Sequence, residues 1–146
     1  MMKFEIIQDQ SLFDVECAEI LKRAMRHAFG ATRPEVCETV DALSVFASRG
    51  RQRLVARTTE GIVGFLDYLD TQISFLMVDP AHHRHGVGSR LAGEAITAIG
   101  ERAWLLCSKD NTGALAFYKH KGFRICGERR GRMFGGLFDN HVLVRG

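Results

Sequence analysis

A strand, a glycine loop and a helix follow one another between residues 73 and 99, and this succession constrains the fold more than any other feature. The apolar run 73–78 has the composition of a buried strand and is closed by Asp79-Pro80. Apolar residues then recur every four positions from Val87 to Ile99, which predicts an amphipathic helix. Between them lies the stretch 83–88, HRHGVG, whose two glycines keep side chains away from the helix start.

The start of such a helix is suited to an anion. Its first backbone N–H groups have no partner inside the helix, and the aligned peptide dipoles place roughly half a positive charge there. The loop therefore predicts a phosphate or pyrophosphate site, although a tight turn that caps an ordinary helix has the same short pattern. A Walker loop is excluded by Ser89-Arg90 after Gly88, and a dinucleotide fingerprint is excluded by Leu91 at the place of its third glycine.

Length and composition set broad limits on the chain. Its 146 residues suit a single domain, 1–146, and 46% hydrophobic with 25% charged residues is typical of a soluble globular protein. The formal charge of +3 fits an anionic ligand but is too small to indicate nucleic acid. The sequence has no apolar run of about 18 residues and no signal-peptide core at its start, so we expect a cytoplasmic location and no membrane partner.

The remaining segments alternate between helical and extended patterns. We expect a helix from Ser11, as N-cap, to Gly30, and a second helix up to Gly50 that opens with Thr32 and Glu35 as a capping box. A short helix is expected from Asn111 to Gly122, and the segment 131–136 is expected to be mobile. There is no C-x-x-C pair, and three of the four cysteines lie in apolar periodic segments, so buried thiols are expected rather than disulfides: Cys17, Cys37, Cys107 and Cys126. The strands are expected at 4–7, 53–57, 62–69, 72–78, 103–107, 123–126 and 141–144.

A second motif lies between residues 111 and 123 and reads N-x-x-A-x-x-F-Y-x-x-x-G-F. Together with V-D-P followed by the G-x-G loop, it resembles the GCN5-related N-acetyltransferase superfamily. The two motifs cover residues 73–123, and the order of the expected elements fits that family from end to end. The resemblance implies an α/β (α+β) fold with a mixed, mostly antiparallel sheet of six to seven strands, flanked by about four helices.

The resemblance also implies a use for individual residues. Met77 and Val78 lie where the strand backbone pairs with the pantetheine arm of acetyl-CoA, and Asn111 lies where the family's asparagine contacts this cofactor. Tyr118 lies where a tyrosine often protonates the leaving thiolate. His83 is a departure, because the family usually has Gln or Arg there. The loop amides that would hold the pyrophosphate belong to Arg84, His85, Gly86, Val87, Gly88 and Ser89.

These assignments are chemically consistent. A tyrosine with a pKa near 10 is protonated at neutral pH and can donate to a thiolate, although Phe117-Tyr118 could also be only the packed face of a short helix. We therefore expect an N-acyltransferase that moves an acetyl group directly from acetyl-CoA to an amine of a small molecule or peptide. The sequence has no recognisable nucleophile–base pair, and Cys107 is expected to be structural.

Several points stay open at this stage. Histone-type relatives carry a basic carboxylate on the strand before the loop, where this chain has Gln72, so Asp67, Asp70, His141 or water could take the proton of the amine. The acceptor region is expected in residues 27–35 and in the last strands. The alternatives are a non-catalytic acyl-CoA-binding or sensing module and an enzyme that uses a longer acyl donor. The chain could also form a homodimer. No metal is expected, because no Cys or carboxylate completes a site with the loop's three imidazoles: His82, His83 and His85.

Overall fold

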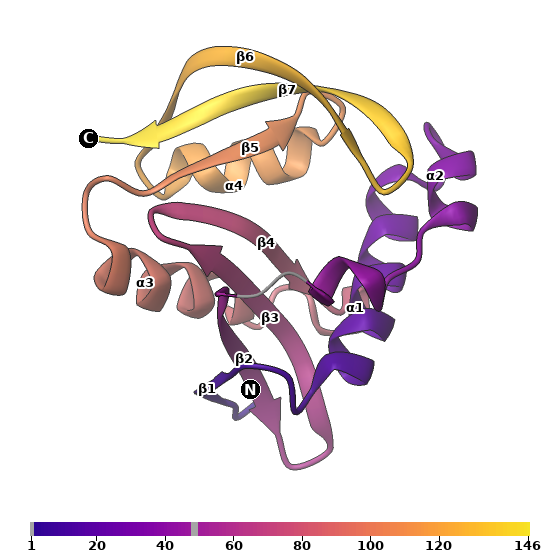
Figure 1. The fold of residues 1–146 in the computed structure, drawn as a ribbon. Coiled ribbons are helices and arrows are strands. Elements are labelled where there is room, and N and C mark those ends of the chain that lie inside the picture. Colours follow the sequence, from indigo (N-terminus) through magenta and orange to yellow (C-terminus); the bar gives the residue numbers. More distant parts are fainter. Residues whose placement is uncertain (1, 48–49) are drawn as a thin grey trace.

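The computed structural model describes residues 2–47 and 50–146, which form one seven-stranded sheet with helices on both faces (Figure 1). The strand order is β1-β2-β3-β4-β5-β7-β6, and every pair is antiparallel except β4 and β5. This is the mixed, mostly antiparallel fold that the sequence predicts. The strands are β1 (Glu5–Asp9), β2 (Gln52–Thr58), β3 (Gly61–Leu69), β4 (Gln72–Val78), β5 (Trp104–Ser108), β6 (Phe123–Met133) and β7 (Gly136–Arg145). The helices are α1 (Asp14–Phe29), α2 (Pro34–Thr39), α3 (Val87–Ile99) and α4 (Thr112–His120), with the short 3-10 turns η1 (Ser44–Ala47) and η2 (Pro80–His82).

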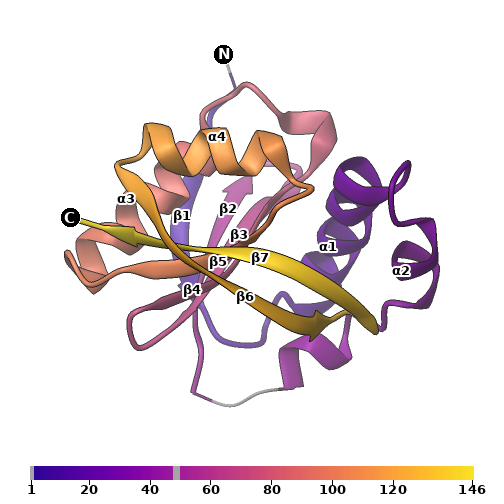
Figure 2. The same ribbon diagram turned by 90° about the horizontal axis from the view of Figure 1, so that it is seen from above.

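Two apolar clusters lie on opposite faces of the sheet. Helices α3 and α4 contribute to one cluster and α1 and α2 to the other, and Figure 2 shows α3 and α1 on either side of the strands. Helix α3 packs closely on β3 at Gly64, where an added Cβ would lie 3.0 Å from the Val87 side chain. A larger residue at Gly64 would push away the helix that carries the loop.

The sheet divides where β4 leaves β5. These two parallel strands pair only at Gln72 with Trp104 and at Ile73 with Leu105. The register of β3 against β4 shifts at the same level, because Tyr68 pairs with Ile73 and Asp67 with Phe75, which leaves Ser74 as a bulge. A bulged residue reverses the alternation of side chains, so Ile73 joins the α3 face whereas Phe75 joins the α1 face. Beyond this point the β4 edge faces an opening.

The predicted start of the first helix is wrong. Helix α1 begins at Asp14, its N-cap is Phe13, and no side chain caps it. The Asp9 carboxylate instead accepts hydrogen bonds from the backbone N–H groups of Leu12 (3.0 Å) and Phe13 (3.3 Å). The turn before the helix is therefore held from β1 and not by Ser11.

The predicted second helix is also wrong in length. Helix α2 has only six residues, its N-cap is Arg33, and Glu35 pairs with the Arg33 guanidinium at 3.0 Å, so the Thr32 capping box does not form. Val40 already has extended dihedrals, and a 3-10 turn follows at 44–47. Closure at Gly50 involves residues 48 and 49, which lie outside the described residues.

The final hairpin is longer than predicted. Strands β6 and β7 continue the expected segments to Met133 and from Gly136, so most of the segment 131–136 belongs to the sheet. The four cysteines are free; Cys17 and Cys107 are buried as predicted, whereas Cys37 is partly buried and Cys126 is exposed. Within the described part of the chain, no helix combines the length and apolar character that crossing a membrane requires.

Candidate active site

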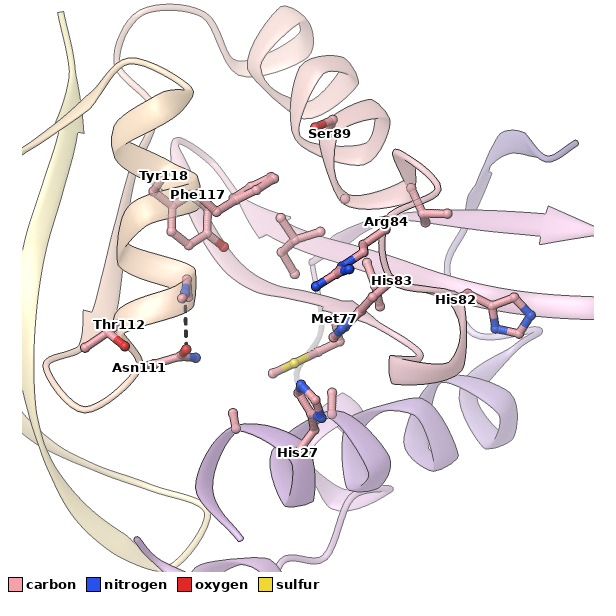
Figure 3. Close-up of a pocket in the computed structure, with 18 of the residues that line it drawn as sticks. His27, Met77, His82, His83, Arg84, Ser89, Asn111, Thr112, Phe117 and Tyr118 are labelled. Carbon is pink, nitrogen blue, oxygen red and sulfur yellow. Dashed lines mark hydrogen bonds between the residues drawn. The ribbon is translucent and has the colours of Figure 1, made fainter. Parts of the chain in front are cut away.

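A cavity of about 690 Å³ lies beside the edge of β4 that β5 has left (Figure 3). It is lined by the end of β4, by the loop that follows, by the start of α4 and by one turn of α1. The predicted cofactor-binding residues all line this cavity, with the exception of His85, which is exposed and lies outside the lining. Tyr118 lines it as well. The structure thus brings together two motifs that are separated by a helix and a strand in the sequence.

The loop 82–86 has the backbone shape of an anion cradle. Arg84 has a left-handed φ of +70° and Gly86 one of +79°, so the chain turns twice before α3 begins at Val87. A left-handed φ is costly for a residue with a side chain, and such strain concentrates at ligand-binding loops. The first hydrogen bond of the helix runs from the Arg90 N–H to the Gly86 carbonyl at 3.0 Å, so the amides before Arg90 lack a carbonyl partner inside the helix.

Gly88 forms the floor of the cavity between α3 and α4. A Cβ at this position would lie 3.6 Å from Val78 and 3.7 Å from the Phe117 ring. Gly86 has no atom within 4 Å of such a Cβ, but its positive φ disfavours any side chain. The two glycines therefore serve different purposes, because Gly86 allows the turn and Gly88 leaves the space.

Asn111 begins helix α4, as the sequence predicts. Its Oδ1 accepts a hydrogen bond from the Ala114 N–H at 3.2 Å, which caps the helix. The side chain also lines the cavity. The cap occupies Oδ1 but leaves the amide N–H₂ group as a donor.

Tyr118 lies inside the protein with its hydroxyl directed from α4 into the cavity (Figure 3). Its residue is 8% exposed, and its ring packs edge-on against Phe117 and Phe123 with centroid separations of 5.3 and 5.7 Å. Burial, with a smaller contribution from nearby Cys107, raises the pKa of the phenol well above its usual value. The hydroxyl therefore stays protonated throughout the physiological pH range.

Helix α1 forms the opposite wall. Its first turn is tied to β2, where Arg53 contacts Asp14 at 2.7 Å, and its last residue, Phe29, packs on Phe138 of β7 at 5.4 Å. The helix therefore crosses the division of the sheet, and Ala24, His27 and Ala28 line the cavity there. His27 falls at the start of the expected acceptor region 27–35, but no motif marked it.

The carboxylate that sequence reasoning considered on β3 does not reach the cavity. Asp67 is 1% exposed and receives a hydrogen bond from Arg53 Nε at 3.1 Å, while Arg53 also contacts Asp9 at 3.0 Å. Burial raises the pKa of Asp67, and the Arg53 guanidinium opposes this change. The residue serves to anchor β2, β3 and α1 together.

The other two candidate bases also lie away from the cavity lining. Asp70 lies in the exposed turn between β3 and β4, with φ of +52°, at the end of β4 opposite the loop. His141 pairs with Cys107 across β7 and β5 and shares its face of the sheet. The imidazoles of His82, His83 and His85 do not form a metal-holding group among the described residues.

Comparisons with known proteins agree with this geometry. A family model for the acetyltransferase (GNAT) family matches residues 16–123, which include both motifs and the wall from α1. The chain belongs to the GNAT family of acetyltransferases. An uncharacterised protein of Mycobacterium leprae, ML0378, is 34% identical over 83 residues, which is 51% of this chain but only 23% of that protein. The chain thus spans about a quarter of the length of this curated relative.

Solved structures show the same GNAT fold at low sequence identity. A GCN5-related N-acetyltransferase from Rhodopseudomonas palustris superposes with a TM-score of 0.82 at 17% identity, covering 99% of this chain and 97% of that one. The PaiA N-acetyltransferase from Thermoplasma acidophilum, in complex with coenzyme A, gives a TM-score of 0.77 at 14% identity, covering 99% of both chains.

Proposed function

We propose that this chain transfers an acetyl group from acetyl-CoA directly to the amine of a small molecule or peptide. The observation that carries the proposal is the cavity itself. The loop with its left-handed turns, the unpaired edge of β4 and the Tyr118 hydroxyl all face this one space. Family membership supports the acetyl donor, and the coenzyme A complex of the PaiA relative supports the class of ligand. When bound, acetyl-CoA would supply the thioester that is cleaved.

The loop would hold the diphosphate of the cofactor. The amides from Arg84 to Ser89 belong to a left-handed turn and a helix start, and both arrangements favour anions. The Arg84 side chain lines the same cavity and adds a positive charge. The backbone of Met77 and Val78 lies on the edge of β4 that lacks a partner strand, so its polar groups are available to the pantetheine amides.

Tyr118 would act as the general acid. Its hydroxyl enters the cavity from α4, and burial keeps it protonated. Donation of its proton to the sulfur neutralises the thiolate as the carbon–sulfur bond breaks. The raised pKa also means that ionisation of free Tyr118 should not limit activity below about pH 10.

The residues favour direct transfer over an acyl-enzyme. Cys107 is the thiol that influences the pKa of Tyr118, yet it is 5% exposed and does not line the cavity. Burial raises the pKa of Cys107 to about 11, so it is a protonated thiol at neutral pH. A nucleophilic cysteine needs the thiolate form and access to the substrate.

Cofactor binding and turnover test the proposal separately. Acetyl-CoA and coenzyme A should raise the melting temperature, since a ligand at a hundred times its Kd adds about 2.7 kcal/mol, whereas ATP and NAD at the same concentration should have little effect. Equal stabilisation by NAD would contradict the role of the loop. Thiol release is then measured with acetyl-CoA and a panel of amines: a polyamine, an amino acid, an aminoglycoside and a peptide with a free N-terminus. Tight binding without turnover on the whole panel would favour a sensing module.

A further inference from the structure

The α1 wall of the cavity carries a histidine. His27 points from α1 into the cavity toward Met77 (Figure 3), and Ala24 and Ala28 of the same helix also line the cavity. It lies on α1, whereas the Tyr118 hydroxyl enters from α4 on the other side of the β4 edge. An imidazole ordinarily titrates near pH 6.5 and can accept a proton from an amine.

The other titratable groups in the cavity are less suited to this task. Asp110, at the start of α4, is the one carboxylate among the described lining residues, and it stands on the same wall as Tyr118. His82 lies with Nδ1 buried and 4.0 Å from an Asp79 oxygen. His83 belongs to the loop that would hold the diphosphate, and its ring lies edge-on to His27 at 5.1 Å; both histidines are exposed. Among the described lining residues, His27 is the titratable side chain that α1 contributes, on the wall opposite Tyr118.

We infer that His27 is the general base that takes the proton from the acceptor amine. This assignment rests on the proposed function. The amine nitrogen donates its electron pair to the acetyl carbon as its proton passes to the His27 imidazole, and the carbon–sulfur bond breaks as Tyr118 gives its proton to the sulfur. The products are the acetylated amine and free coenzyme A. The two protein groups then return to their starting states by exchanging a proton with solvent.

His27 on α1 and the Tyr118 hydroxyl from α4 enter the cavity from different sides. A thioester held between them would therefore have a proton acceptor on one side and a proton donor on the other. An acceptor would therefore enter along α1, beside Ala24 and Ala28, where the lining side chains are small. The charged or titratable groups on the elements around His27 are Arg23 and Arg26 on α1, Asp79, His82, His83 and Arg84 after β4, Asp110 in the turn before α4, and Tyr118 on α4.

The test compares His27→Gln and His27→Ala with His120→Gln, which changes an exposed histidine outside the cavity lining. With acetyl-CoA and the best amine of the panel, kcat/KM of His27→Gln should fall by about 10²- to 10⁴-fold, the range of a positioned base. The acidic limb of the pH profile should disappear, and added imidazole should restore part of the activity of His27→Ala. The melting shift caused by acetyl-CoA should stay as in the parent, and His120→Gln should keep parental kinetics.

Different failures have different meanings. A parent that turns over an amine while His27→Gln keeps its rate and its acidic limb would overturn the base assignment and leave the transferase intact. Equal loss in His83→Gln would also overturn it, because the ring pair and not His27 would then be required. A parent without turnover on any amine would overturn the transferase and, with it, the role of His27.

Discussion

The two walls of the cavity are built from different material. The wall of the loop and α4 consists largely of backbone: left-handed turns at Arg84 and Gly86, the amides that start α3, and the capped first turn of α4. The α1 wall is a single helix whose buried face packs on the sheet, with an ion pair from Arg53 to Asp14 at its start and one from Arg23 to Asp79 near its middle. Backbone shape forms the first wall, and side-chain packing and ion pairs between elements position the second.

The difference has a functional meaning. A cofactor is the same for every acetyltransferase, so a rigid site made from backbone suits it, because backbone amides survive most substitutions. Acceptors differ, and a wall made of one helix can change its lining by changing a few side chains such as His27. Substitutions in each wall should therefore have different consequences, for cofactor binding and the acid in the first wall and for the placement of α1 in the second.

Tyr118→Phe should reduce kcat by about 10²- to 10⁴-fold, which corresponds to about 3–5 kcal/mol of barrier. The substitution keeps the ring that packs on Phe117 and Phe123 and removes only the proton donor. Steady-state thiol release gives kcat, while thermal shift with acetyl-CoA checks binding. Unchanged kcat would mean that water protonates the thiolate, and a large loss of stability would mean that the hydroxyl is structural.

Arg53→Met should lower the free energy of unfolding by about 3–5 kcal/mol, because it removes the closest cation from buried carboxylates. Asp9 and Asp67 both lose their contact with Arg53, which leaves Asp67 only the longer contact with Arg51 at 4.0 Å, and α1 loses its tie to β2. The matched control is Arg57→Met on the same strand, whose pair with Glu5 is exposed and worth less than about 1 kcal/mol. Urea unfolding measures both variants. Equal losses would show that the buried cluster does not hold the α1 wall.

Tyr118 could be predicted as a site residue from the sequence, whereas the role of Arg53 could not. The loop and the α4 motif could be predicted because their geometry is local, since a glycine pair before a helix and an Asn at its start define where the amides point. His27 could not be found in this way, because its place depends on α1 crossing the division between β4 and β5. Asp67 was a candidate base because it lies on the strand before Gln72, and the sequence does not reveal its partner Arg53, which lies 14 residues away.

The errors in the fold have the same origin. The second helix was predicted to continue through Val40 because apolar residues recur at helical spacing, but the chain extends there and returns to the sheet. The bulge at Ser74 has no local signal, yet it decides that Phe75 and Met77 face α1. Contacts between distant segments set both features, and the pattern of one segment does not contain them.

Gly88→Val should abolish the stabilisation by acetyl-CoA, about 2.7 kcal/mol at a hundred times the parental Kd, because its side chain would fill the floor between Val78 and Phe117. Gly93→Val on the same helix is the control, since a Cβ there meets open space. Gly86→Val is a poorer test, because φ of +79° strains the folded chain as well. Thermal shift with and without acetyl-CoA decides the matter. Retained stabilisation in Gly88→Val would place the cofactor elsewhere.

Asp79→Asn should have the smallest effect on the free energy of unfolding. It tests the ion pair that links the segment after β4 to α1. The Asp79 carboxylate accepts hydrogen bonds from the Ala81 N–H at 3.1 Å and from Arg23 of α1 at 2.8 Å. Burial raises its pKa, but these two donors outweigh that effect, so the pKa of Asp79 lies below its usual value. Asparagine keeps the acceptor for Ala81 and loses the charge that faces Arg23.

The sign of the pH dependence follows from this lowered pKa. The contribution of Asp79 to stability is complete above the ordinary carboxyl pKa near 3.9 and is lost as the pH falls through the lower pKa of the folded state. At pH 7, Asp79→Asn should therefore cost about 0.5–1 kcal/mol, or about 2–4 °C in Tm, and the difference from the parent should shrink toward pH 3. Calorimetry across this range measures it, with Glu101→Gln in an exposed turn as the control. Arg23→Gln should produce the same loss, and the double variant should lose little more. Additive losses, or a difference that persists at pH 3, would show that the ion pair does not join the two walls.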